Sequence, residues 1–295
     1  MAGGSASVLA LAWAAACAIV YQRAFGRRYI DPRMTTPDDY GAPHEVLDVR
    51  TADGVSLAAW YLPGSLPAAV VVSTGYRGRA GDVLGISVAL QRAGFHVAAY
   101  GWRGTPGSDA AAHTLGVYER NDLRAVVGAL AARLGDIPIG LLGYSMGGAV
   151  SISVAADDPR IAAVVTDSAF ADPRQLIGDR VRSSMRVPAA VVMMPVIALL
   201  ARRTGARLSD FMPVTVVGRI SPRPLLVIHG EGDTTVPARH AEMLYNAAGE
   251  PKELWLLPGV GHVGAYFAGR QAYVDRVRGF FTAAMLGPGR IAEVC

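Results

Sequence analysis

Residues 139–150 read IGLLGYSMGGAV, a stretch that combines a strand pattern, a glycine-rich turn and a helix pattern. The run up to Tyr144 is compact and apolar, as in a buried strand, and the residues after Ser145 follow a helical pattern. Between them, Gly143-Tyr144-Ser145-Met146-Gly147 has the G-x-S-x-G spacing of a sharp strand-to-helix turn. Glycines leave room for close packing there, so the pattern predicts that Ser145 is a nucleophile at the carboxyl edge of a sheet. The alternative is a tight turn with a passive serine.

Similar apolar runs alternate with longer helical patterns along the rest of the chain. Strands are predicted at 68–74, 96–100, 139–144, 161–166, 224–230 and 252–259, and helices at 83–94, 118–134, 147–156, 238–248 and 271–285. Strands that are apolar on both sides are typical of a parallel sheet covered on both faces. We therefore expect an α/β fold with a mostly parallel central sheet and helices on both faces. A hairpin that turns at Ala52-Asp53-Gly54 should precede it.

A serine hydroxyl is weakly nucleophilic until a base takes its proton, so a histidine must lie beside it. Where the nucleophile sits on such a turn, the chain order is Ser, acid, His, which leaves His229, His240 and His262. His262 follows the last predicted strand in a glycine-rich loop, and we predict that it is the base. His229 is expected to make structural hydrogen bonds, and His240 to face solvent on a helix.

The acid that orients the histidine is predicted to be Asp233, in the turn that follows the strand at 224–230. Glu231 in the same turn is the reserve candidate, and Asp167 at the end of an earlier strand is the third. Negative charge that develops on the carbonyl oxygen requires fixed backbone donors. The amide of Met146 is one predicted donor, and the loop 74–78 should supply the other from Tyr76.

The composition argues against several other functions. The net charge of +4 comes almost wholly from scattered arginines, since Lys252 is the only lysine, and no basic stripe indicates nucleic acid binding. The sequence shows neither a phosphate-binding loop nor the residue spacing of a metal site, so no cofactor is expected. About half of the residues are apolar, as suits one globular domain with a large core.

Residues 1–22 carry no charged side chain and are close to the length of a membrane-spanning helix. They predict an amino-terminal membrane anchor, and the arginines that follow favour a cytoplasmic orientation of the rest of the chain. A cleaved signal peptide and a helix that packs on the domain are the alternatives. The expected division is an anchor at 1–22, a linker at 23–43, a catalytic domain at 44–285 and a tail at 286–295.

Residues 171–221 interrupt the regular alternation of strands and helices. They are read either as ordinary packing helices or as a small helical cap over a pocket. A cap would offer Met193, Met194 and Leu199 to an apolar substrate.

The motifs TGYRG at 74–78, GYSMG at 143–147, HGEGDTTVP at 229–237 and PGVGH at 258–262 together resemble the α/β-hydrolase superfamily over residues 44–285. Within it, the chain is similar to small serine hydrolases, often membrane-anchored, that are grouped with serine aminopeptidases, esterases and lipases. Relatives commonly have His-Gly where this chain has Thr74-Gly75, so the shape of the loop at 74–78 is expected to differ.

The resemblance implies an enzyme that acts on a small acyl substrate through Ser145, His262 and Asp233. Hydrolysis of a carboxylic ester, with an acyl chain that is apolar or lipid-like, is the leading expectation. A peptidase or acyltransferase of the same fold and a non-catalytic, membrane-tethered binding module are the alternatives. The sequence does not fix the oligomeric state.

Overall fold

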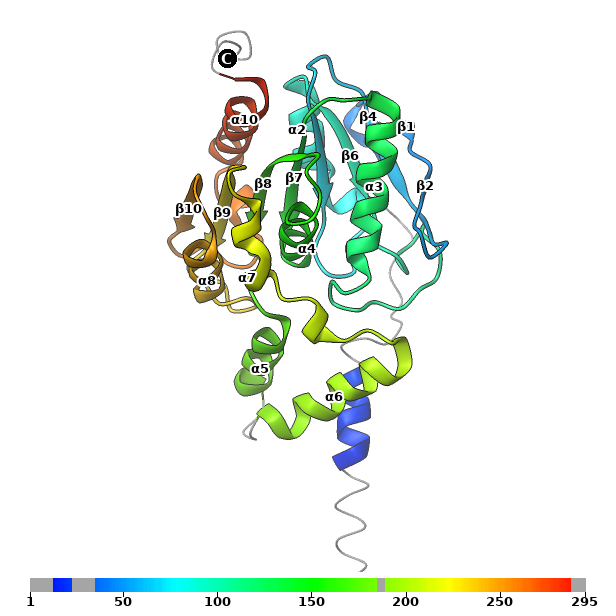
Figure 1. Cartoon of the computed structure of the whole chain (residues 1–295), viewed down its shortest axis with the longest axis vertical. Coiled ribbons are helices and arrows are strands. Elements are labelled where there is room, and N and C mark those ends of the chain that lie inside the picture. Colours follow the sequence, from blue (N-terminus) through cyan, green and yellow to red (C-terminus); the bar gives the residue numbers. More distant parts are fainter. Residues whose placement is uncertain (1–12, 23–34, 185–188, 288–295) are drawn as a thin grey trace, which may run out of the picture.

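The computed structural model describes residues 13–22, 35–184 and 189–287. An eight-stranded sheet with the order β1-β4-β6-β5-β7-β8-β9-β10 runs through the centre of the molecule (Figure 1). Its strands are β1 (Glu45–Val46), β4 (Ala59–Leu62), β5 (Ala69–Ser73), β6 (His96–Tyr100), β7 (Ile139–Tyr144), β8 (Ile161–Asp167), β9 (Leu225–Gly230) and β10 (Lys252–Leu257). The six strands β5 to β10 are parallel, and β4 and β1 continue the sheet in antiparallel pairing. The predicted mostly parallel α/β sheet is confirmed.

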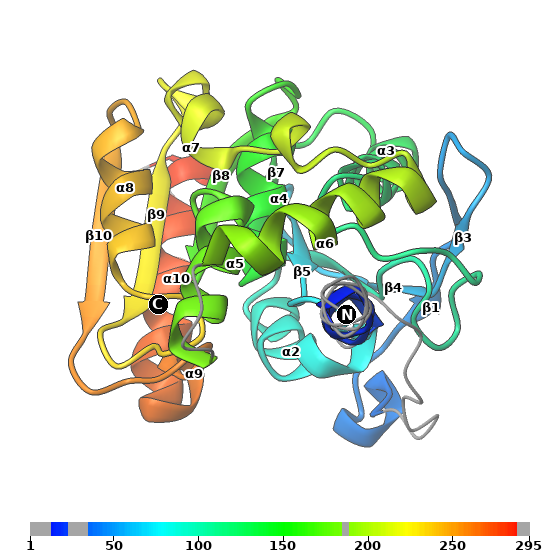
Figure 2. The same ribbon diagram turned by 90° about the horizontal axis from the view of Figure 1, so that it is seen from below.

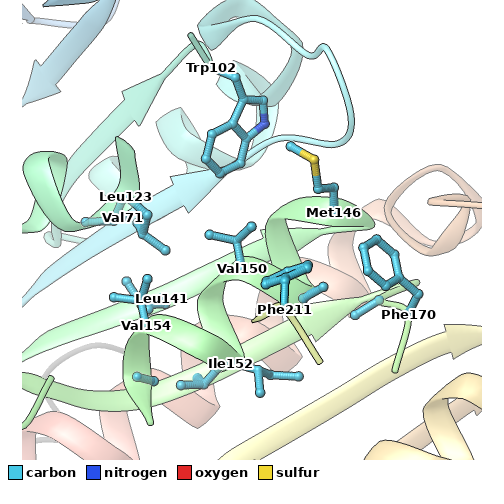
Figure 3. Close-up of a cluster of buried hydrophobic side chains, with 14 of the residues drawn as sticks. Val71, Trp102, Leu123, Leu141, Met146, Val150, Ile152, Val154, Phe170 and Phe211 are labelled. Atoms are coloured by element: carbon cyan, nitrogen blue, oxygen red, sulfur yellow. The ribbon is translucent and has the colours of Figure 1, made fainter. Parts of the chain in front are cut away.

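Helices cover both faces of the sheet, and each face has its own layer of apolar side chains. On one face lie α2 (Leu84–Arg92) and α10 (Arg270–Leu286), preceded by the short helices η1 (Pro37–Tyr40), η2 (Ala80–Val83) and α9 (Ala265–Ala268). On the other lie α3 (Glu119–Leu134), α4 (Met146–Ala155) and α8 (Arg239–Ala247). Figure 3 shows part of this second layer, in which Val71 and Leu141 of the sheet lie near Val150 and Val154 of α4. The strands are therefore apolar on both sides because both sides are buried.

The predicted hairpin forms, but its arms are divided between two sheets. β2 (Val49–Arg50) and β3 (Ser56–Leu57) pair with each other around the turn, whereas β1 pairs with β4 at the edge of the central sheet. At the opposite edge, β10 is only partly buried, because a strand there has one neighbour and its outer side is open to solvent.

The chain between β8 and β9 forms α5 (Pro173–Ser184), α6 (Ala189–Thr204), η3 (Leu208–Asp210), α7 (Pro213–Val216) and η4 (Val217–Ile220). Helices α5 and α6 lie beyond the carboxyl end of the parallel strands, together with the helix of residues 13–22 (Figure 1). Seen from that end, α5 and α6 lie in front of the sheet (Figure 2). The boundaries proposed from the sequence, including an insertion at 171–221, stay predictions.

The prediction of an amino-terminal membrane span is wrong, and with it the predicted membrane-anchored location. Among the described residues, no helix has both the length and the apolar character needed to cross a bilayer. Cys17 and Tyr21, one turn apart, are buried in the core, and Arg203 of α6 lies 5.0 Å from the Tyr21 ring centre. This segment is therefore a helix that packs on the protein; residues 1–12 lie outside the described part.

The close approach of β7 and α4 gives a test of the packing. A methyl group on Gly143 would come within 2.4 Å of the backbone of Gly147, whereas one on Gly128 in α3 would meet nothing within 4 Å. We expect Gly143→Ala to lower the free energy of unfolding by about 2 kcal/mol or more, as overpacking does. The matched control, Gly128→Ala, should raise it by about 0.5–1 kcal/mol, because alanine is the better helix former. Urea unfolding of both variants measures the difference, and equal stabilities would contradict the predicted clash.

Candidate active site

The predicted turn lies between β7 and α4, and its serine adopts an unusual backbone conformation. Ser145 has φ 51° and ψ −116°, a region that a residue with a side chain seldom occupies. Its amide donates a 2.7 Å hydrogen bond to the carbonyl oxygen of Asp167 at the end of β8. A side chain at Gly147 would come within 2.5 Å of the Thr74 carbonyl oxygen. Neighbouring backbone therefore fixes the turn, and only 8% of Ser145 remains exposed.

The structure brings Ser145, His262 and Asp233 together from three separate loops. His262 Nε2 lies 3.0 Å from Ser145 Oγ, and His262 Nδ1 lies 2.7 Å from Asp233 Oδ2. A carboxylate only accepts hydrogen bonds, so Nδ1 carries the hydrogen and Nε2 is left to accept from the serine hydroxyl. The arrangement can thus move the serine proton to the imidazole.

The carboxyl group of Asp233 is buried yet held in its charged form. Its Oδ1 accepts hydrogen bonds of 2.8 Å from the amides of Thr235 and Val236. Burial alone would raise the pKa of Asp233, but hydrogen bonds from His229, His262 and the Val236 amide outweigh it and hold the pKa well below its usual range. A carboxylate that stays ionised fixes the orientation of the imidazole at neutral pH.

The competing candidates from the sequence have other surroundings. Glu231 is exposed, and Asp167 is buried with its Oδ1 accepting a 2.9 Å hydrogen bond from Ser168 Oγ. His229 is buried and its Nε2 lies 2.8 Å from the carbonyl oxygen of Val236, which fits the expected structural role.

The expectation that His240 faces solvent is wrong. The residue is fully buried, because its face of α8 packs against the chain between β8 and β9. The Ala171 amide donates to His240 Nδ1 at 3.2 Å, and Nε2 lies 3.3 Å from Asp179 Oδ2 of α5. His240 thus ties α8 to the segment that precedes α5.

Sequence reasoning missed how the loop of His262 is fixed. The amide of Val263 donates a 3.0 Å hydrogen bond to Ser168 Oγ, and both residues have positive φ, 55° and 56°. Ser168 Oγ in turn donates to Asp167, so a single hydroxyl connects the end of β8 to the residue after His262. No pattern in the sequence indicates this contact, because the two residues are 95 positions apart.

The two backbone groups predicted to bind an oxyanion line the same cavity as Ser145. Met146 is the first residue of α4, and the first amides of a helix have no partner within the helix. The loop that carries Tyr76 is held by Trp102, whose Nε1 donates to the carbonyl oxygens of Thr74 and Gly75 at 3.1 and 3.0 Å. Their roles as oxyanion donors stay predictions.

A cavity of about 350 Å³ opens at Ser145 and His262, and we name it the nucleophile cavity. Most of its wall is apolar, with the charged side chain of Arg180 of α5 also lining it. Met193, Met194 and Leu199, which a cap was expected to offer, are not among the residues that line it, and Met194 is 61% exposed. The lining comprises Gly75, Tyr76, Leu115, Ser145, Met146, Phe170, Leu176, Arg180, Thr235, Val236, His262 and Val263.

Comparison with known proteins identifies the family. A sequence model described as "Serine aminopeptidase, S33" matches residues 64–212. The chain belongs to this family of hydrolases. Its members have the α/β-hydrolase fold, so the predicted fold class is confirmed, and the chain is an enzyme of the hydrolase class.

Individual relatives agree with this assignment. An uncharacterized protein of Mycobacterium tuberculosis is 31% identical over 246 residues, which cover 81% of this chain and 80% of the relative. An esterase of Pyrococcus furiosus superposes with a TM-score of 0.71 at 22% identity, covering 88% of this chain and 99% of its own. A puromycin-hydrolyzing peptidase of M. tuberculosis gives a TM-score of 0.67 at 17% identity, covering 83% of this chain and 40% of its own. At such low identity, the two structures show the fold alone.

Asp167 makes the stability of the protein depend on pH. Burial raises the pKa of its carboxyl group from 3.8 to about 6, so between these values the unfolded chain releases a proton that the folded chain keeps. Stability from this group is complete below pH 3.8 and is lost as the pH rises through 6.

Replacement of this buried carboxyl by an amide should remove the dependence. The free energy of unfolding of Asp167→Asn minus that of wild type should be about 2 kcal/mol higher at pH 8 than at pH 4.5, because only the wild type loses stability as this carboxyl ionises. Urea unfolding at both pH values measures it, and a difference that does not change with pH would contradict it. The surface substitution Asp136→Asn should stay within about 0.5 kcal/mol of wild type at both.

Proposed function

We propose that the protein hydrolyses carboxylic esters through a covalent acyl-enzyme, with Ser145 as nucleophile, His262 as base and Asp233 as the acid that orients the histidine. The distances of 3.0 Å from Nε2 to Oγ and 2.7 Å from Nδ1 to Oδ2 support it, since they lie within the range for proton transfer. This continuous contact from hydroxyl to buried carboxylate is the observation that carries the proposal.

In the first half of the reaction, Ser145 Oγ attacks the carbonyl carbon while its proton passes to His262 Nε2. The negative charge on the carbonyl oxygen is stabilised by the amides of Met146 and Tyr76. The bond to the alcohol then breaks, and the leaving oxygen takes the proton from Nε2. In the second half, water gives a proton to Nε2 and attacks the acyl carbon. The bond to Ser145 Oγ then breaks, Oγ takes the proton back from Nε2, and the free acid leaves.

The lining of the nucleophile cavity favours an apolar acyl group. Leu115, Phe170, Leu176 and Val236 contribute apolar side chains, and buried apolar contact area is the main source of binding energy for such a group. An aminopeptidase must also bind the free ammonium group next to the bond it cleaves, which calls for a carboxylate. Of the described residues that line this cavity, none is aspartate or glutamate. Ester hydrolysis is therefore favoured over the aminopeptidase reaction.

The two carboxylates of one turn provide the sharpest test of the roles. Asp233→Asn should lower kcat toward short p-nitrophenyl esters by roughly 10³-fold or more, because the amide no longer orients the imidazole in the required tautomer. Glu231→Gln, two residues away and exposed, is the matched control and should retain kcat within about twofold. Similar losses in the two variants would rule out the assignment of the acid.

The nucleophile is tested by covalent labelling. A fluorophosphonate should modify the wild-type protein, because it reacts with an activated serine hydroxyl. The variant Ser145→Ala should remain unlabelled while keeping the unfolding midpoint of a folded protein. Labelling of the alanine variant at the wild-type rate would refute the assignment of Ser145.

A further inference from the structure

A second cavity, of about 240 Å³, lies next to the nucleophile cavity. Segments far apart in the sequence form its wall: η1, the loop at 74–75, η2 with α2, the end of β7, the loop after His262, and the start of α9 and α10. Its apolar and aromatic lining includes Val83, Ile86, Tyr144, Val263, Tyr266 and Phe267. Neither Ser145 nor His262 is among the described residues that line it, so the triad itself does not explain this space.

The two cavities belong to opposite faces of the sheet. Leu115, Phe170 and Val236 of the nucleophile cavity are part of the core layer under α3, α4 and α8. By contrast, Ile86 and Tyr266 of the second cavity are part of the layer under α2 and α10. Ser145 stands at the edge of the sheet between the two layers, so a substrate attached to it can extend toward both.

Gly75 and Val263 line both cavities and separate them. A methyl group on Gly75 would lie 3.6 Å from Ser145 Cβ, so the glycine leaves the space beside the nucleophile open. On the other side, Val263 directly follows His262, and its backbone is held by the hydrogen bond to Ser168. The wall that the two cavities share therefore lies directly beside the histidine that moves the proton.

We propose that the second cavity binds the leaving group of the ester, and that this leaving group is an uncharged alcohol with an aromatic ring. The inference rests on the proposed ester hydrolysis. The leaving oxygen must meet His262 Nε2 to take its proton, which directs the alcohol past Val263. The acyl group then stays in the nucleophile cavity, beside Met146 and Tyr76, whose amides face the carbonyl oxygen.

The wall of the second cavity favours an aromatic and uncharged occupant. Tyr40, Tyr144, Tyr266 and Phe267 give it four aromatic rings, and rings prefer offset or edge-to-face contact with another ring. Its charged lining residues, Asp82 and Arg270, are exposed and of opposite sign, and Asp82 already pairs with Arg79 at 3.0 Å. The lining therefore offers no net charge that would favour an ionic leaving group.

This assignment has a kinetic consequence that separates it from a general packing role. Esters of one acid with different alcohols form the same acyl-enzyme, so the alcohol affects only the steps up to its release. A change in the second cavity should therefore alter kcat/KM according to the alcohol and leave the rate of hydrolysis of the shared acyl-enzyme independent of the alcohol.

The test compares 2-phenylethyl butyrate with methyl butyrate. Ile86→Phe fills part of the second cavity, and we expect the ratio of kcat/KM for the phenylethyl ester to that for the methyl ester to fall at least tenfold. Phe267→Ala, at a side chain that is 77% exposed and safe to truncate, should lower the same ratio severalfold through KM for the phenylethyl ester. Val46→Ala removes an equally exposed apolar group, 79% exposed, outside both cavities and should leave the ratio unchanged.

Two results would overturn the assignment. Equal changes for both esters in Ile86→Phe and Phe267→Ala would show that the second cavity does not hold the alcohol. The variants could instead change the ratio of kcat/KM for methyl octanoate to that for methyl butyrate, while the ratio for the phenylethyl and methyl esters stays constant. That result would show that the second cavity holds the acyl chain. Failure of the wild-type protein to form a fluorophosphonate adduct at Ser145 would contradict the proposed function itself. This outcome is distinguishable from the two results above, which concern only the second cavity.

Discussion

The strained backbone of Ser145 sets the geometry of the site, because it points the hydroxyl out of the turn between β7 and α4. A residue with a side chain at φ 51° and ψ −116° costs on the order of 1–3 kcal/mol and persists only where its surroundings fix it. Here the Ser145 amide donates a hydrogen bond to the Asp167 carbonyl oxygen. Close backbone contacts at Gly143 and Gly147 leave no space for the chain to turn in another conformation. The strained turn places the hydroxyl at the edge of the sheet between two core layers, within hydrogen-bond distance of His262 and in the wall of the nucleophile cavity.

A second constraint is the burial of the Asp233 charge. An ionised carboxylate out of water is costly unless it is fully hydrogen-bonded, and Asp233 meets this condition through two backbone amides and the imidazole of His262. Because both oxygens are engaged, the carboxylate cannot rotate freely, and the imidazole is held with Nε2 toward Ser145. The hydrogen bonds that compensate for burying the charge therefore also fix the orientation of the base.

The features that the sequence predicts well are those with a local cause. The strands and helices around Ser145 follow from apolar runs and periodicity. The chain order that points to Asp233 and His262 belongs to the fold as a whole, and their catalytic roles stay predictions. The burial of His240 and the tie between Ser168 and Val263 arise from contacts between distant segments, which no local pattern records. The apolar segment that includes Cys17 and Tyr21 shows the same limit, since its composition suits a membrane or a protein core equally well. The second cavity could not be predicted from the sequence for the same reason, because its lining residues are spread along the chain from Tyr40 to Arg270.

In the proposed mechanism, an acyl group is transferred to Ser145 and then to water. Intact-protein mass spectrometry of a rapidly acid-quenched reaction with a slowly hydrolysed ester tests it most directly. We expect a transient mass increase equal to the acyl group, located by peptide mapping to the fragment with Ser145 and independent of the alcohol. Steady turnover of the ester with no adduct on the protein, or with the adduct on another residue, would contradict it.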